Sequence, residues 1–198
     1  MYPTFAVLGA VFLFATGGLG IKVIEANAFS ISGTRSLIGA IFLLLVLLAQ
    51  GKRSSIFRLN TRGWLTAISY AFVVTCFVTA NKLTTAANAI FLQYTMPAWV
   101  LVGGALWLNE KITLGRMGSV LCCLFGMVLF FLGDLQPADW LGNAVALCSG
   151  FFFAVMTLLV RSERDTSAVP AVMMGNFLTA LTNLPLAFWI APQDFSQI

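Results

Sequence analysis

The chain contains no histidine, and only 9% of its 198 residues are charged. About one quarter of the residues in a soluble domain are charged, so this composition excludes an ordinary soluble, secreted or nucleic-acid-binding protein. Without histidine there are no histidine metal ligands, no Ser–His or Cys–His nucleophile pairs and no imidazole proton relays. The four cysteines fall inside apolar runs without metal-ligand spacing. We therefore predict no catalytic residue, no cofactor and no metal site.

Long apolar runs indicate the class of the protein. A membrane-spanning helix needs roughly 20 mostly apolar residues to cross about 30 Å of hydrocarbon. Seven runs meet this requirement, at residues 4–24, 31–50, 63–82, 85–108, 114–133, 140–160 and 169–191. The chain is therefore predicted to be an all-α, polytopic membrane helix bundle with seven transmembrane helices. The first run has no basic region before it and is expected to serve as an uncleaved insertion signal.

Lysine and arginine are distributed unevenly between the two sides of this predicted bundle. Eight of the 11 lie in the connections 50–62, 109–116 and 161–168, whereas Lys22, Arg35 and Lys82 lie toward the other side. Positive residues favour the cytoplasmic side of a membrane protein. The distribution predicts a multi-pass protein of the inner or plasma membrane with a cytoplasmic N-terminus.

A weak internal repeat relates the first run to the sixth. A shift of 139 positions superposes similar residues, including Leu8 on Leu147, Phe12 on Phe151 and Lys22 on Arg161. A displacement of five helices reverses the direction across the membrane, as in the inverted repeats of many secondary transporters. Residues 1–136 are predicted to form one complete five-helix repeat. Residues 137–198 are predicted to form an incomplete second repeat of two helices.

The fourth run carries polar residues at a depth where lipid offers no hydrogen-bond partners. On a helical wheel, one stripe gathers within about 60° of Asn88: Thr84, Thr85, Phe91, Leu92, Thr95 and Trp99. Pro97 is expected to kink the helix near its middle and to free a carbonyl there. We interpret this region as the wall of a substrate cavity, which makes Asn88, Thr95, Gln93 and Trp99 candidate substrate-binding residues. The alternative is that these groups join neighbouring helices.

Two more residues are candidates for the same cavity. Arg35 lies about one and a half turns into the second run, where a charge is costly. Its guanidinium is suited to bind a carboxylate or phosphate of a substrate. The alternatives are that it reaches back to the outer interface or pairs with Glu25. Tyr70, near the cytoplasmic third of the third run, is the other candidate.

The stretch from Thr84 to Thr113 resembles the EamA-type domain of the drug/metabolite transporter (DMT) superfamily. The residues that carry the resemblance are Thr85-Ala86-Ala87-Asn88-Ala89, Pro97 and Leu108-Asn109-Glu110-Lys111-Ile112-Thr113. The proline often found before the second-helix arginine is absent, and so is the tryptophan–glycine pair of the first helix. The resemblance covers residues 4–133 well and 140–191 loosely. It implies a ten-helix carrier of two inverted five-helix repeats that moves small metabolites, often outward.

The predicted function is therefore an integral membrane transporter, and not an enzyme, that moves a small metabolite by alternating access. Glu110 is predicted to be structural, pairing with Lys111, Arg116 or backbone amides. The expected partners are a small-molecule substrate and the lipid bilayer, with no nucleic acid, and a homodimer or a partner that completes the bundle. Two alternatives stay open: a truncated or accessory membrane subunit that does not transport, and an intramembrane lipid-modifying enzyme. The sequence reveals neither the substrate nor the coupling ion.

Overall fold

All secondary structure in the described part of the chain is helical. The computed structural model describes residues 20–51, 58–131, 139–163 and 168–189, together with residues 5, 8, 9 and 17, but not the side chains of residues 130 and 131. The helices are α2 (Ala28–Ala49), α4 (Thr61–Leu83), α5 (Ala86–Gln93), α6 (Met96–Trp107), α7 (Leu114–Phe131), α8 (Trp140–Ser162) and α9 (Ala168–Trp189). The prediction of an all-α helix bundle is confirmed.

Five segments are long and apolar enough to cross a membrane. They are Ala28–Ala49, Thr61–Leu83, Ala86–Trp107, Trp140–Ser162 and Ala168–Trp189, and α7 contributes a shorter apolar stretch, Leu114–Leu129. These six match the second to the seventh predicted runs, with ends that differ by a few residues. The predicted run 4–24 falls largely outside the described residues.

Polar side chains fix where two of the helices, α2 and α4, begin. The Asn27 side chain accepts a hydrogen bond from the backbone N–H of Ser30 at 2.6 Å, which starts α2. Asn60 accepts from the N–H of Gly63 at 2.7 Å at the start of α4. Such caps satisfy backbone donors that the first helical turn leaves unpaired. The cap at Asn27 explains why α2 begins three residues before the predicted apolar run at residue 31.

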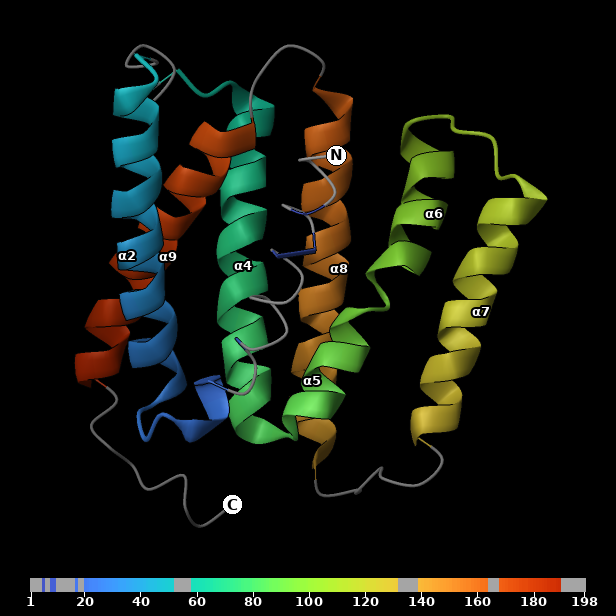
Figure 1. Cartoon of the computed structure of the whole chain (residues 1–198), viewed down its shortest axis with the longest axis horizontal. Helices are drawn as coiled ribbons and strands as arrows, with labels where there is room; N and C mark the ends of the chain where they lie inside the picture. The colour runs from blue at the N-terminus through green and yellow to red at the C-terminus, as the bar shows by residue number, and fades with distance from the viewer. Residues whose placement is uncertain are drawn as a thin grey trace.

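The bundle is organised around α4 (Figure 1). This helix packs against α8 and α9, and to a smaller extent against α2 and α5. The remaining close pairs are α2 with α9, and α8 with both α5 and α6, whereas α7 lies at the edge of the bundle beside α6. Successive spans run in opposite directions, so α2, α6 and α8 all finish at the same end of the bundle (Figure 1). Of the eight basic residues of the predicted cytoplasmic side, the structure describes five, and these belong to this end: Arg58, Arg62, Lys111, Arg116 and Arg161.

Candidate functional site

The fourth predicted span is two helices rather than one bent helix. α5 ends at Gln93, Tyr94 and Thr95 form a turn, and α6 starts at Met96 with Pro97 in its first turn. Proline has no N–H to donate to the carbonyl four residues earlier, which here belongs to Gln93, and its ring crowds that carbonyl. The predicted kink therefore becomes a break. The break changes the direction of α6, so a wheel drawn on one continuous helix does not relate Asn88 to Trp99 (Figure 1).

Asn88 lies at the start of α5 in a small polar cluster. Its side-chain Nδ2 donates to Thr84 Oγ1 at 3.2 Å, and its backbone N–H donates to Thr85 Oγ1 at 3.1 Å. Thr84 Oγ1 in turn lies 3.0 Å from Asp139 Oδ2 and 3.1 Å from Asn143 Oδ1, at the start of α8. Asn88 is only 1% exposed. The cluster thus joins the connection between α4 and α5 to the first turns of α8.

Gln93 makes a second contact between α5 and α8. Its Nε2 donates to Ser149 Oγ at 2.8 Å, and Ser149 Oγ donates to the backbone carbonyl of Val73 on α4 at 3.1 Å. Gln93 and Ser149 are both buried. On the helical wheel Gln93 lies outside the stripe around Asn88. In the structure both side chains are buried in the protein. These two bonds link three helices through a single serine.

Thr95 and Trp99 also lie beside α8. The Thr95 hydroxyl donates to the carbonyl of Leu92 at 2.8 Å, within its own turn. A side chain at Gly150 would come within 2.8 Å of both Thr95 Oγ1 and the Gln93 carbonyl oxygen, so the missing side chain lets α8 approach the break closely. The Trp99 ring makes an edge contact with Phe151 at 5.6 Å between centroids, while 44% of Trp99 stays exposed.

The four candidates on the fourth span thus have α8 as their neighbour. Gln93 has a partner on another helix, as the helix–helix alternative requires, whereas the Asn88 side chain bonds to Thr84 at the end of α4. Thr95 sits at the break, and Trp99 keeps a large exposed surface. Their assignment to a substrate cavity stays a prediction.

Tyr70 belongs to a different group of polar contacts, between α4 and α9. Its hydroxyl donates to Asn176 Oδ1 at 3.2 Å, and Asn176 Nδ2 donates to the Val172 carbonyl at 3.0 Å. Two turns further along α9, Asn183 Nδ2 donates to Ser32 Oγ on α2 at 2.7 Å and to Thr75 Oγ1 on α4 at 2.8 Å.

The sequence analysis missed Asn176 and Asn183, although both carry a detectable signal. They lie seven residues apart in the last apolar run, with Thr179 between them, and therefore share one face of a helix. All three are buried. An amide inside an apolar run was the same signal that singled out Asn88. Applied to α9, it would have predicted a helix that packs through a polar face.

Arg35 is the residue whose surroundings differ most from those of the other candidates. It is exposed, and within the part of the chain that the structure describes it makes no ion pair and no hydrogen bond. The alternative that it pairs with Glu25 is thus not observed. Because α2 begins at Ala28, Arg35 lies two turns from the helix end, about 10 Å, which is deeper than the predicted run indicated.

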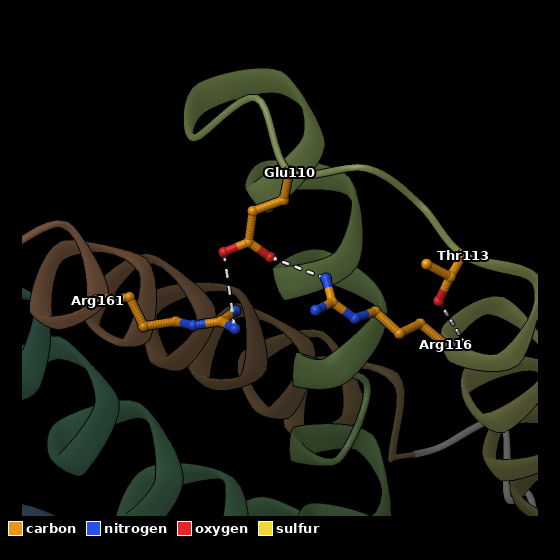
Figure 2. Close-up of polar contacts among 4 residues, drawn as sticks. All are labelled: Glu110, Thr113, Arg116 and Arg161. Carbon is orange, nitrogen blue, oxygen red and sulfur yellow. Dashed lines mark hydrogen bonds and ion pairs between the residues drawn. The ribbon is translucent and has the colours of Figure 1, made fainter.

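Glu110 lies in the connection between α6 and α7 and holds two arginines (Figure 2). Its Oε2 lies 3.2 Å from Arg116 Nη1 at the start of α7, and its Oε1 lies 3.7 Å from Arg161 Nη2 at the end of α8. The Glu110 N–H donates to the Gly104 carbonyl at 3.0 Å, and Asn109 before it has a φ of 52°. Arg116 is one of the predicted partners, whereas Arg161 was not foreseen.

The described residues contain no metal-binding cluster, and a small pocket lies at one end of the bundle. Nowhere among them do three or more His, Cys, Asp or Glu side chains gather in a group that could hold a metal ion. The pocket lies where α4 begins and α8 ends, and its lining includes Arg58, Asn60, Thr66 and Glu163. Asn60 Nδ2 donates to Glu163 Oε1 across it. It lies at the end of the bundle that contains the basic connections, not at the depth of Gln93.

Comparisons with known proteins give a family, a relative and a similar fold. The EamA-like transporter family matches residues 1–132. A 129-residue stretch is 32% identical to the "Uncharacterized transporter YoaV" of Bacillus subtilis (strain 168), and covers 61% of this chain but only 41% of that relative. A solved protein crystal structure superposes with a TM-score of 0.69 at 18% identity, over 94% of this chain and 70% of the other. This likeness concerns the fold alone. The match over residues 1–132 covers most of the chain, which therefore belongs to the EamA-like transporter family of membrane proteins.

Proposed function

We propose that this protein exports a small metabolite across the inner or plasma membrane or facilitates its movement, and catalyses no chemical reaction. Membership of a transporter family is the observation that carries this proposal. The composition supports it, since the chain lacks histidine and the described spans have no carboxylate away from their ends. The basic residues of the connections support a cytoplasmic N-terminus.

The proposed mechanism is alternating access between inverted repeats, with residues 1–136 as the first repeat and residues 137–198 in the second. The shift of 139 positions supports it, as does the alternation of the spans. A central site lies between such repeats in carriers of this kind. We place Asn88, Gln93, Thr95 and Trp99 on its wall, because all four lie where the first proposed repeat meets α8. Arg35 and Tyr70 complete the proposed site.

Two residues have a structural role in this scheme. Pro97 produces the break between α5 and α6, which leaves the Gln93 carbonyl without its helical donor. Glu110 holds the start of α7 through Arg116 and, in the observed state, the end of α8 through Arg161. A second copy of the chain or a partner helix bundle is proposed to complete the pathway.

Reconstitution in proteoliposomes tests the proposal. Vesicles containing the purified chain are loaded with a panel of labelled small metabolites, and efflux is followed against empty vesicles. Asn88→Leu and Thr95→Leu should abolish efflux of any transported solute while expression stays normal. Thr182→Leu is the matched control, because Thr182 is exposed and bonds only within α9.

Three results bear on the proposal. Unchanged efflux in both leucine variants would remove Asn88 and Thr95 from the pathway. Efflux that appears only after a second membrane protein is added would mean that the chain needs the proposed partner bundle and does not form the pathway alone. Chemical turnover of a lipid without solute movement would favour the intramembrane enzyme.

A further inference from the structure

Arg35 is unusual among the charged residues of the described spans. Every other one, such as Arg62, Lys82 or Arg161, lies within the first or last turn of its helix. Arg35 alone lies two turns inside, about 10 Å from the start of α2. A charge at this depth in an apolar helix is costly and usually faces a partner or a watery cavity. Its position therefore requires a specific reason.

The residues one turn away on α2 show which way Arg35 points. Ile31 is buried in an apolar cluster with Ile21 and with Val74, Phe77 and Val78 of α4, and Ser32 accepts from Asn183 of α9. On the other side, Gly39 lies against the Asn176 side chain. Ile38 and, one turn further along the same face, Phe42 are largely exposed. Arg35 therefore leaves α2 at the border of its packed face, on the side of Ile31 and α4.

Two lysines lie nearer than Arg35 to this end of the bundle, next to the same apolar cluster. Lys22 follows Ile21 directly, and Lys82 lies one turn beyond Val78 on α4. Lys82 Nζ donates to the Ile24 carbonyl at 2.6 Å, and its charge interacts with those of Lys22 and Glu25. Three cations and one carboxylate thus surround the Ile31 cluster at this end of the bundle. The field there favours an anion.

We propose that the seam between α2 and α4 binds the anionic group of the transported solute, a carboxylate or a phosphate, with Arg35 as its deep ligand. This inference rests on the proposed transport function and names its substrate class. The planar guanidinium presents two parallel N–H donors that match either group. Lys22 and Lys82 stand at the mouth of the seam and attract the anion toward Arg35. A lipid phosphate offers the same chemistry, so the test separates a soluble anion from a headgroup.

Cysteine accessibility tests where Arg35 points and which charge the seam accepts. Arg35→Cys is made in the 198-residue chain with its four native cysteines replaced by alanine, and Ile38→Cys is the control on the exposed face. Both are treated in proteoliposomes with an anionic sulfonatoethyl and a cationic trimethylammonioethyl methanethiosulfonate. The anionic reagent should modify Arg35→Cys roughly fivefold faster at low salt, and adding Lys82→Gln should reduce that ratio. Equal rates for the two reagents at Arg35→Cys would refute an anion site in the seam. An Arg35→Cys that is as unreactive as Ile38→Cys would also refute it, and would assign Arg35 to a lipid headgroup.

Anion binding is measured on the intact chain in nanodiscs of zwitterionic lipid. Succinate and inorganic phosphate, each at constant ionic strength, are compared for their effect on the thermal unfolding midpoint. At least one should raise the midpoint of the wild type, have less effect on Arg35→Lys and have none on Arg35→Gln. Lys111→Gln removes a charge from the other end of the bundle and should keep the full shift. An equal shift in Arg35→Gln, or no shift with either anion, overturns the proposal.

These results are independent of the efflux assay. A chain that transports only uncharged solutes and lacks the charge selectivity at position 35 refutes the anion site and keeps the transport function. A chain that shows the selectivity and the Arg35-dependent stabilisation but moves no solute keeps the anion site and refutes the transport function.

Discussion

Replacing Gln93 with leucine removes one hydrogen bond between α5 and α8 at nearly constant side-chain volume. The bond lost is the 2.8 Å contact from Gln93 Nε2 to Ser149 Oγ, in a buried position. Hydrogen bonds between membrane helices contribute about 0.6 kcal/mol on average and up to about 1.7 kcal/mol. Apolar substitution brings little compensation, because lipid is as apolar as leucine. We expect Gln93→Leu to lower the free energy of unfolding by about 1 kcal/mol.

Ser149→Ala perturbs the same chain of bonds from its centre. It removes the acceptor of Gln93 and the donor to the Val73 carbonyl, and leaves the Gln93 amide buried without that partner. An unsatisfied buried polar group costs about 1–3 kcal/mol. The double variant no longer contains the orphaned amide. It should therefore be more stable than the sum of the single effects predicts, by about 1 kcal/mol.

Reversible unfolding in mixed micelles, followed by tryptophan fluorescence, measures all three variants. Thr157→Ala is the matched control on α8, since its hydroxyl bonds the Phe153 carbonyl within the same helix. Additive effects of Gln93→Leu and Ser149→Ala would refute the coupled chain of bonds. A Gln93→Leu variant with unchanged stability and lost efflux would instead favour the cavity interpretation of Gln93.

Three other predictions follow from single contacts. Gly150→Ala should destabilise the protein by about 1–3 kcal/mol in the same unfolding assay, because its new carbon would lie 2.8 Å from the Gln93 oxygen; Gly118→Ala, with open space around it, should be neutral. Glu110→Gln should cost about 1 kcal/mol or less at low ionic strength, and a cost that persists in high salt would contradict an ion-pair role. A disulfide between cysteines introduced by Ser32→Cys and Asn183→Cys should stop efflux without lowering the thermal unfolding midpoint, and reduction of the disulfide should restore efflux. Undiminished efflux would mean that α2 and α9 stay together during transport.

Hydropathy alone predicted the spans, because lipid imposes a length and a composition on every crossing helix. The runs at 63–82 and 140–160 differ from α4 and α8 by no more than two residues at either end. Hydropathy does not predict the ends of a helix where a local hydrogen bond or a proline sets them. Asn27 starts α2 earlier than its apolar residues do, and Pro97 turns one predicted helix into two.

Hydropathy could not predict which residues the polar side chains bond to. Gln93 bonds to a serine 56 residues away, and Asn183 to one 151 residues away. Nothing in the local pattern distinguishes a polar side chain that faces another helix from one that faces a cavity, because both must avoid lipid. Glu110 shows the same limit: Arg116 was foreseeable six residues along the chain, whereas Arg161 required the end of α8 to be placed beside α6.

The distant polar contacts have a common feature that bears on the proposed mechanism. Those of Tyr70, Thr84, Gln93, Glu110 and Asn183 all join a residue of the proposed first repeat to one of the second. The Lys82 bond to Ile24 remains within the first repeat. If the repeats rock as rigid bodies, contacts of the first kind must be exchanged in each cycle, while the second persists. Such bonds suit exchange because each contributes only about 1 kcal/mol in a membrane, so two packings can have similar free energies. On this argument Gln93 and Asn183 join helices in one state and become available to solute in the other, which makes the two interpretations of these amides successive rather than exclusive.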